Sequence, residues 1–372
     1  MNYCKSCILP DSRPNLSIGD DGVCNACRSH ATKKEIDWKE REVSFKEVVK
    51  NAKALSSGYD CLIPVSGGKD STWQVLKCLE YGLNPLCVTW RTPARTGIGQ
   101  KNLDNLISLG VDHLDFSINP KVEKYFVSKS LEKFGTTALP MHMAIFSIPQ
   151  NVAINYRIPL IIWGENSAFE YGNSDEETTG FKLDEKWLKY HGVTNGTSAK
   201  DWIDDVLTEK KMAPYYLPDQ VAIDNAGVLA CFLGYYFEWD PVETFRVAEE
   251  NGFQSLKDTV KTGYYGFADI DDAFIISVHH WFKWYKFGFT RLWDNLSLEI
   301  RNNRMTREEA IDVINTRGSE EPNEDIEMLC EYLNISRDKF DDIADRHRNQ
   351  MIWSKKQGKW EIDSFLLPDW KW

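Results

Sequence analysis

With 372 residues, 42% of them hydrophobic and 27% charged, the chain has an ordinary globular composition, and its length predicts two domains with a small appendage. Its 56 acidic residues outnumber its 44 basic ones, and the net charge of −12 argues against a broad nucleic-acid surface. No apolar run approaches a membrane span and the first residues carry no secretion signal, so we expect a cytoplasmic protein with neither membrane nor nucleic acid as a partner.

The N-terminus carries four of the nine cysteines as two CxxC pairs. Cys4 and Cys7 form the first pair, Cys24 and Cys27 form the second, and residues 8–23 are long enough for a short ribbon that brings the pairs together. Four thiolates at this spacing are typical of a structural Zn2+ site with no open ligand position. The alternatives are a redox pair or incidental cysteines. The other five cysteines lie in apolar stretches and are expected in the core.

Strand and helix patterns alternate from residue 59 onward, after a charged stretch at residues 33–42 that predicts a linker or an exposed helix. Such alternation is typical of a parallel sheet covered by helices on both faces. The expected strands are residues 59–65, 85–90, 112–118 and 159–163, and the expected helices are residues 71–81, 100–109 and 141–156. The predicted fold class is therefore α/β, with a doubly wound parallel sheet.

A glycine-rich turn connects the first strand to its helix, with the sequence Ser66-Gly67-Gly68-Lys69-Asp70-Ser71. Glycines allow backbone N–H groups to approach a polyphosphate, while the following helix presents its positive N-terminus. The serine hydroxyls add donors, Lys69 adds a cation, and Asp70 either holds the loop or helps to position Mg2+. The residues expected to bind ATP are Ser66, Gly67, Gly68, Lys69, Asp70, Ser71, Thr72 and Thr89.

This turn matches neither the Walker A spacing nor the dinucleotide GxGxxG pattern. It resembles the PP-loop of ATP pyrophosphatases, whose domain is of the adenine nucleotide alpha hydrolase-like (HUP) type. The resemblance implies cleavage of ATP between its α and β phosphates and transfer of AMP to an oxygen atom of the substrate. A glycine turn without function is the alternative.

Weaker candidates lie at the carboxyl ends of the other predicted strands, where α/β sheets place their ligands. Glu165 follows the strand at residues 159–163 and can bind Mg2+ or substrate, or else be an exposed loop carboxylate, so we take Lys69, Asp70 and Glu165 as the candidate catalytic residues. The remaining candidates are Trp90, Arg91, Arg95, His142, His279 and His280, for each of which a solvated loop or a packed core position is the competing interpretation.

The C-terminal half is expected to be helix-rich from residue 239 onward and to recognise substrate or partner. Helices are predicted after a capping box at residues 306–309 and over residues 336–348. The expected domains are a zinc ribbon and linker (1–45), a PP-loop ATP pyrophosphatase domain (46–235) and a mostly helical C-terminal region (236–372).

Nearly the whole chain resembles the bacterial N-acetyl sugar amidotransferases of lipopolysaccharide O-antigen and nonulosonic-acid synthesis. The resemblance rests on the two cysteine pairs, the SGGKDS loop, the run Trp163-Gly164-Glu165-Asn166 and residues 279–304. It implies that ATP activates the amide oxygen of an N-acetylated, nucleotide-linked sugar, and that ammonia then displaces AMP to give an acetamidino group.

The same resemblance implies a separate glutaminase subunit, with a synthase-like companion, as the source of ammonia. The sequence itself offers no N-terminal cysteine nucleophile and no cysteine in a nucleophile elbow. The expected cofactors are thus ATP, catalytic Mg2+ and structural Zn2+, and the oligomeric state is left open, with a homodimer as one option.

Two other functions compete with this interpretation. A tRNA-modifying thiolase or lysidine-type ligase also combines a PP-loop with zinc ribbons, but the acidic composition disfavours a tRNA surface. A zinc-ribbon scaffold without activity is the second alternative, and the intact SGGKDS run argues against it.

Overall fold

A computed structural model describes residues 1–171, 180–184, 187–188, 194–257 and 259–372 of the chain. The strands of the central sheet are β1 (Cys61–Pro64), β2 (Pro85–Trp90), β3 (Asp112–Phe116), β4 (Leu160–Trp163) and β5 (Leu229–Phe232). The helices up to residue 250 are α1 (Asn25–Thr32), α2 (Trp38–Leu55), α3 (Lys69–Glu80), α4 (Gly97–Ser108), α5 (Pro120–Phe134), α6 (Leu139–Tyr156), α7 (Ser167–Tyr171), α9 (Gln220–Asn225), α10 (Leu233–Tyr236) and α11 (Pro241–Glu250).

The C-terminal region consists of helices followed by a small hairpin. These elements are α12 (Ile275–Phe287), α13 (Arg291–Arg301), α14 (Arg307–Arg317), α15 (Asn323–Leu333), α16 (Arg337–Arg346), β6 (Trp353–Lys356) and β7 (Lys359–Ile362). Short 3-10 turns occupy Lys33–Glu35, Ala199–Trp202 and Ala213–Tyr215.

The five strands of the central sheet are all parallel and have the order β3-β2-β1-β4-β5. The chain therefore starts in the middle of the sheet, moves outward to β3 and returns past β1 to β4. The order reverses between β1 and β4, and in doubly wound sheets such a switch point opens a crevice at the carboxyl ends of the strands.

The sheet carries apolar side chains on both faces, which explains why helices cover both of them. On one face, strand residues such as Ile63 and Ile162 pack against α2, α3 and α4. On the other face, Leu62 and Ile161 pack against α5, α6 and the turn that contains Trp202. Because successive residues of a strand point to opposite faces, a strand that is apolar throughout is buried between two layers of helices. The predicted doubly wound α/β class is confirmed.

The sequence located the first four strands and their helices to within a few residues, but it missed α5 and β5. Helix α5 has an ordinary N-terminal signal, since the Asn119 side chain accepts a hydrogen bond from Lys121 N and Pro120 stands at the first position. Strand β5 has only four residues and is paired with β4 across a segment of about seventy residues, so no local pattern marks it.

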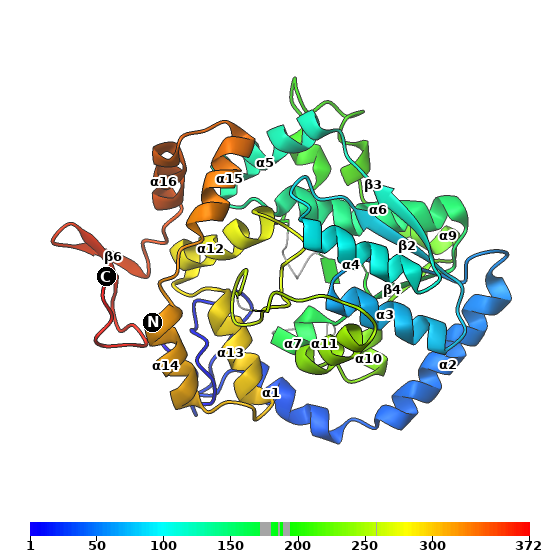
Figure 1. The fold of residues 1–372 in the computed structure, drawn as a ribbon, viewed down its shortest axis with the longest axis horizontal. Helices are drawn as coiled ribbons and strands as arrows, with labels where there is room; N and C mark the ends of the chain where they lie inside the picture. Colours follow the sequence, from blue (N-terminus) through cyan, green and yellow to red (C-terminus); the bar gives the residue numbers. More distant parts are fainter. Residues whose placement is uncertain (172–179, 185–186, 189–193, 258) are drawn as a thin grey trace.

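The N-terminal segment packs against the C-terminal elements rather than against the sheet. Ile8 and Leu9 share one apolar cluster with Trp293 of α13 and with Trp353 of the β6–β7 hairpin. Figure 1 shows the N-terminal coil beside α13 and α14, with both chain ends on the same side of the molecule. The two ends of the chain, which are far apart in the sequence, therefore share one hydrophobic core.

Helix α11 lies beyond the domain boundary expected at residue 235, yet it packs against α3 of the sheet layer. The three-part division of the chain stays a prediction. None of the helices in the described part of the chain has the length and apolarity needed to cross a membrane.

Candidate active site

The glycine-rich turn lies at the carboxyl end of β1 and leads directly into α3, as the PP-loop resemblance requires. Gly67 has φ +89°, and a Cβ atom at this position would lie 2.7 Å from the Leu103 backbone nitrogen. Only glycine accepts both the left-handed backbone and this close approach to α4. The glycine is therefore needed for the path of the loop itself.

Hydrogen bonds within the turn fix its shape. The Ser66 N–H donates to Ser71 Oγ (3.1 Å), and the Gly68 N–H donates to Ser66 Oγ (3.2 Å). The Thr72 hydroxyl donates to the Gly68 carbonyl (3.1 Å) and its side chain is fully buried. Thr72, predicted to bind the nucleotide, thus contacts the loop rather than the open space beside it.

Lys69 and Asp70 form the centre of a partly buried polar network. Lys69 Nζ lies 2.6 Å and 2.7 Å from the two carboxylate oxygens of Asp70. Asp70 Oδ1 also accepts hydrogen bonds from Trp239 Nε1 and from the Thr244 hydroxyl, each at 3.0 Å. Trp239 and Thr244 lie at the start of the α11 region, so this region holds the loop's acidic residue in place.

Glu165 lies in the same cavity as Lys69 and Asp70, as the sequence predicted from its place after β4. We call this cavity, of about 150 Å3, the phosphate-loop cavity; Ser66 and Gly68 also line it. Burial, together with the negative charge of Asp70 as the second cause, raises the pKa of Glu165 to about 7. A carboxyl group with such a pKa can exchange a proton near neutral pH.

A larger cavity of about 320 Å3 lies beside it, at the carboxyl ends of β1 and β2, and we call it the strand-end cavity. Thr89, Trp90 and Arg95 line it together with apolar residues of α6. The Thr89 hydroxyl donates to the Val65 carbonyl (2.7 Å), so its side chain belongs to the sheet's own hydrogen bonding. Arg95 forms two 2.7 Å bonds to Asp115.

Trp90 closes one wall of the strand-end cavity and is held by a buried acid. Its Nε1 donates to Glu123 Oε1 at 2.8 Å, and Glu123 is only 3% exposed. Burial raises the pKa of Glu123 to about 7, partly offset by this hydrogen bond. The indole thus presents a fixed aromatic surface to the cavity.

Sequence analysis missed a group of carboxylates that the C-terminal region contributes to the site. Asp269 and Asp271 line both the phosphate-loop cavity and the strand-end cavity, so the two cavities adjoin there. The Thr96 N–H donates to the Asp271 carbonyl (3.1 Å), and a Cβ on Gly99 would lie 2.6 Å from the Asp271 Cα. The backbone of Asp271 is therefore clamped against the start of α4.

Burial is the main cause of the raised pKa values of Asp271 and Asp272. It raises the pKa of Asp271 to about 7, with the nearby charge of Asp272 as the second cause. It raises the pKa of Asp272 to about 6, although the Thr92 hydroxyl and backbone N–H groups of α12 stabilise its charged form. Carboxylate oxygens are the ligands that Mg2+ prefers, and Asp70, Glu165 and Asp271 all line the phosphate-loop cavity. The residues present therefore fit a Mg2+–polyphosphate group.

Aromatic rings and one face of α13 complete the phosphate-loop cavity. Sequence analysis assigned the rings no role in the site, and it marked α13 only through the family resemblance of residues 279–304. Tyr265 stacks on Phe267 (centroids 4.7 Å apart), and Lys69 Nζ lies 5.4 Å from the centre of the Phe267 ring. From α13, Arg291 and Asn295 reach the same cavity. These residues line the cavity beside the loop with both apolar and polar groups.

The remaining predicted candidates lie elsewhere. Arg91 is half-exposed and 3.6 Å from Asp115. His279 is hydrogen-bonded to the Thr136 hydroxyl (2.9 Å) and packs near His142, and neither histidine lines the two cavities beside the loop. His280 lines a different cavity, formed by C-terminal elements.

The four N-terminal cysteines converge, as their spacing predicted. Their Sγ atoms all lie within 4.8 Å of one another, with Cys7 and Cys24 at 3.8 Å and Cys4 and Cys27 at 4.0 Å. Four sulfur ligands placed tetrahedrally at about 2.3 Å from Zn2+ are separated by roughly 3.8 Å. The cluster therefore has the ligand number, ligand type and spacing of a Zn2+ site.

Arg307 ties this cluster to the C-terminal region. Its Nε donates to the Cys7 carbonyl at 2.9 Å and approaches the Cys4 carbonyl at 3.4 Å. Backbone N–H groups of Cys7 and Cys24 donate to Cys4 Sγ, at 3.4 Å and 3.2 Å. Such contacts orient thiolate ligands and stabilise their charge.

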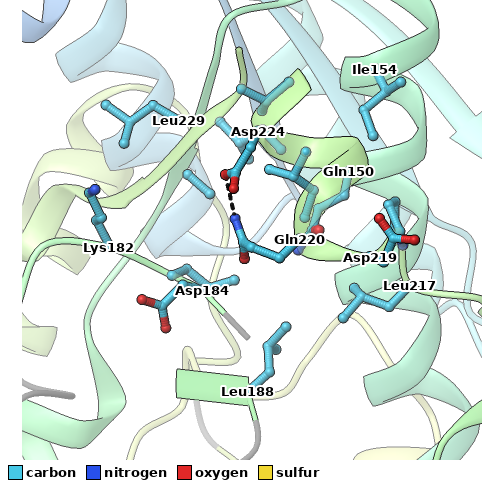
Figure 2. Close-up of a pocket in the computed structure, with 16 residues that line it drawn as sticks. Gln150, Ile154, Lys182, Asp184, Leu188, Leu217, Asp219, Gln220, Asp224 and Leu229 are labelled. Atoms are coloured by element: carbon cyan, nitrogen blue, oxygen red, sulfur yellow. Dashed lines mark hydrogen bonds between the residues drawn. The ribbon is translucent and has the colours of Figure 1, made fainter. Parts of the chain in front are cut away.

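A further cavity, of about 270 Å3, lies at the β4–β5 edge of the sheet. Figure 2 shows Gln150 of α6 with Gln220 and Asp224 of α9 among the residues that line it, and Gln220 is bonded to Asp224 at 2.8 Å. No residue singled out from the sequence lines this cavity, so it stands apart from the glycine-rich loop.

Comparisons with known proteins identify a related family for only part of the chain. Residues 259–366 match the C-terminal domain of WbpG-like LPS biosynthesis proteins, and this segment contains Asp269, Asp271, Arg291 and Asn295. No curated protein matches the chain. The segment that supplies the missed cavity residues is thus the one that resembles a known domain.

Two solved structures are similar over part of the chain. A predicted subunit of tRNA methyltransferase from Methanocaldococcus jannaschii is 15% identical, with a TM-score of 0.30 over 51% of this chain and 74% of that one. NMN synthetase from Francisella tularensis is 14% identical, with a TM-score of 0.28 over 58% of this chain and 94% of that one. Likenesses this distant say nothing about substrate.

Proposed function

We propose that the chain is an ATP-dependent amidotransferase, which converts the N-acetyl group of a sugar into an acetamidino group during assembly of a bacterial surface glycan such as an O-antigen or a nonulosonic acid. One observation carries the proposal. Lys69 and Asp70 of the glycine-rich loop share a cavity with Asp271 and Asn295, which come from the segment similar to an LPS biosynthesis domain. The glycine-rich loop, which we propose as the nucleotide site, therefore shares a cavity with a segment similar to a glycan-related domain.

The reaction we propose has two steps. The amide oxygen of the acetamido group attacks the α-phosphorus of ATP, and pyrophosphate leaves. Ammonia then attacks the activated carbon, and AMP leaves with its bond to the former amide oxygen. An amide oxygen is a poor leaving group and AMP is a good one, so dividing the reaction in this way lowers each barrier. The net products are the acetamidino sugar, AMP and pyrophosphate.

The residues of the loop have distinct roles in this scheme. The backbone N–H groups of the turn and the N-terminus of α3 stabilise phosphate charge. Lys69, which belongs to the loop and is paired with Asp70, neutralises charge on the departing pyrophosphate. Asp70, Glu165 and Asp271 would hold Mg2+, which supplies charge stabilisation on the phosphates when bound.

A proton must leave the nitrogen after ammonia attacks. Glu165 and Asp271 each have a pKa raised to about 7, mainly by burial, so whichever of the two carboxylates does not hold Mg2+ can accept a proton near neutral pH and release it afterwards. Tyr265, Phe267 and Trp239 enclose the same cavity. Exclusion of water by these rings protects the activated intermediate from hydrolysis.

Ammonia is proposed to come from a separate glutaminase subunit. The cysteines in this chain are poor nucleophile candidates, because four belong to the N-terminal cluster and the other five are buried in hydrophobic cores. A glutaminase of the cysteine type needs an accessible, activated thiol. Zn2+ in the cysteine cluster is proposed to be structural, with all four positions filled by thiolates.

The test combines nucleotide and sugar analysis. The purified protein is incubated with ATP, Mg2+, ammonium salt at high pH and a panel of free and nucleotide-linked N-acetylated sugars. We expect AMP, pyrophosphate and a sugar that has exchanged its amide oxygen for NH and gained positive charge. Lys69→Ala should abolish AMP formation, whereas Lys77→Ala, a change on the same helix at an ion pair with exposed Glu80, should not.

Other outcomes of this assay discriminate among the alternatives. AMP formation with unmodified tRNA, and with no sugar, would overturn the sugar assignment in favour of a tRNA-modifying enzyme. Absence of AMP and pyrophosphate with every acceptor, in a protein that binds Zn2+, would favour a scaffold.

A further inference from the structure

A third cavity, of about 190 Å3, lies within the C-terminal region beside the phosphate-loop cavity. The turn at residues 260–263, helix α12, the start of α13 and the end of α14 with the loop that follows form its walls. All of its lining residues lie within residues 259–366, the segment that matches the WbpG-like C-terminal domain. We call it the C-terminal cavity.

Positively charged side chains line this cavity in a chain whose net charge is strongly negative. Lys261, Arg291 and Arg317 contribute three cations, while Glu320 and Glu321 contribute two carboxylates. The Lys261 ammonium is paired with Asp325, so the two guanidinium groups are the cations that matter for a ligand. Glu321 is bonded to Arg337, outside the cavity, at 2.7 Å. The cavity therefore presents two guanidinium groups, those of Arg291 and Arg317, to a small anion.

Arg317 is the cation best placed to exchange its present partner for a ligand. It pairs with Glu320 at 3.3 Å, and the two side chains are 31% and 62% exposed. An exposed pair of this kind contributes little to stability, whereas a charge-assisted bond to a desolvated anion is stronger. Its NH2 group also donates to the Gly263 carbonyl (3.3 Å), which holds the guanidinium at the turn.

The start of α13 adds backbone donors to the same wall. Thr290 is the N-cap residue, and within the described chain its side chain makes no capping hydrogen bond. The first N–H groups of a helix lack intrahelical partners and carry partial positive charge, so they favour an anion. Thr290, Arg291 and Leu292 all line the cavity, which places these groups beside the guanidinium of Arg317.

The C-terminal cavity borders the nucleotide site. Arg291 lines both the C-terminal cavity and the phosphate-loop cavity. The turn at Gly263 (φ +68°) lines the C-terminal cavity and packs tightly against residues that line the phosphate-loop cavity. A Cβ atom on Gly263 would lie 2.1 Å from Asn295 Oδ1 and 3.0 Å from Arg291 Cγ. His280, on the C-terminal side, lies 3.5 Å from Asp269 on the nucleotide side. A molecule anchored in one cavity therefore lies next to the other.

We propose that the C-terminal cavity binds the anionic group, a phosphate or a carboxylate, of the second substrate and so directs the rest of that molecule across Arg291 toward the ATP site. The inference rests on the proposed function, because the second substrate is the sugar that receives AMP. The cavity is smaller than a site that encloses a whole drug-sized ligand. It therefore holds one end of the substrate, and the reacting acetamido group lies in the phosphate-loop cavity.

Titration calorimetry with three probes tests this assignment. N-acetylglucosamine 1-phosphate carries a phosphate, glucuronate carries a carboxylate, and N-acetylglucosamine is the neutral control. We expect the wild-type protein to bind one or both anions and not the neutral sugar, and the identity of the anion that binds tells a phosphate from a carboxylate site. Arg317→Gln should weaken that binding roughly tenfold or more, the effect of losing a hydrogen bond to a charged group.

Arg246→Gln is the matched control. Arg246 also forms an exposed pair three residues apart, with Glu243 at 3.1 Å, but it lies on α11 and does not line the C-terminal cavity. Its replacement should leave anion binding unchanged. Both variants should bind a non-hydrolysable ATP analogue as the wild type does, which also shows that they are folded.

Three results would overturn the assignment: no binding of either anion, equal binding of the neutral sugar, or unchanged anion binding by Arg317→Gln. These results are distinguishable from a failure of the proposed function. If sugars elicit AMP formation but Arg317→Gln leaves the KM for the sugar unchanged, the proposed amidotransferase activity is supported and the proposed anion site is refuted. If no sugar elicits AMP, the calorimetry still decides whether the anion site exists.

Discussion

Replacing Gly67 by alanine tests the path of the glycine-rich loop most directly. The backbone at this position has φ +89°, a region in which a Cβ atom costs about 1–2 kcal/mol. The new Cβ would also lie 2.7 Å from the Leu103 nitrogen and 2.8 Å from its Cα. Leu103 is only 1% exposed in the core, so α4 cannot retreat freely, and overpacking of this kind adds about 1–3 kcal/mol.

Gly110→Ala separates the two contributions. Gly110 has φ +101°, but nothing lies within 4 Å of the position its Cβ would take. Its replacement should therefore cost only the backbone term, about 1–2 kcal/mol. We expect Gly67→Ala to lower the free energy of unfolding by about 1–3 kcal/mol more than Gly110→Ala does, and to weaken binding of a non-hydrolysable ATP analogue that Gly110→Ala leaves unchanged.

Urea unfolding followed by tryptophan fluorescence measures the stabilities, and titration calorimetry measures the nucleotide affinities. If Gly67→Ala is no less stable than Gly110→Ala and binds the ATP analogue normally, the close approach between the loop and α4 is not a feature of the folded protein. The assignment of the loop as a phosphate cradle would then lose its geometric basis.

Three further predictions concern the carboxylate, the tryptophan and the cysteine cluster. Burial raises the pKa of Glu165 from 4.5 to about 7, so the folded chain binds more protons than the unfolded chain between these values and loses stability as the pH rises through them. Glu165→Gln removes this loss, and urea unfolding should find the variant more stable than the wild type by roughly 1–3 kcal/mol at pH 8 and little different below pH 5. Trp239→Phe removes the 3.0 Å bond to Asp70 and should weaken calorimetric binding of the ATP analogue by roughly three- to tenfold, because one hydrogen bond contributes about 0.5–1.5 kcal/mol. Arg307→Ala removes the bond to the Cys7 carbonyl and should speed Zn2+ release to a chromogenic chelator roughly tenfold, with Arg304→Ala as a control that leaves the cluster's contacts intact.

Each of these predictions has a contrary outcome. An unchanged pH dependence in Glu165→Gln would place that carboxyl in water rather than in the cavity. Wild-type nucleotide affinity in Trp239→Phe would mean that the indole does not hold Asp70 during binding. Equal Zn2+ release from the two arginine variants, or no bound Zn2+ in the wild type, would contradict the role assigned to Arg307.

The features that the sequence predicted correctly are those whose signals are local. Two CxxC pairs, a glycine-rich turn between a strand and a helix, and apolar runs bounded by glycines each depend on residues close together along the chain. Cys4 and Cys24 converge because each pair occupies one turn. Strands β1, β2 and β4 were found because nearly all of their residues are apolar, whereas the edge strand β3 carries polar and charged residues. Glu165 was found by its position after β4.

Only the tertiary structure decided which residues close the candidate site. Asp271, Asn295 and Phe267 lie some two hundred residues beyond the glycine-rich loop, yet they line the same cavity. No local pattern around Asp271 and Phe267 indicates this, and the resemblance of residues 279–304 did not place Asn295 in the site. All three are brought there by the packing of the C-terminal helices against the N-terminal segment and the sheet. Local chemistry can be predicted from short runs of residues, whereas a cavity depends on burial between elements that are distant in the chain. For this protein the sequence alone determined the candidate phosphate-binding loop and the cysteine cluster, and the fold determined the acids, rings and cations that surround the loop.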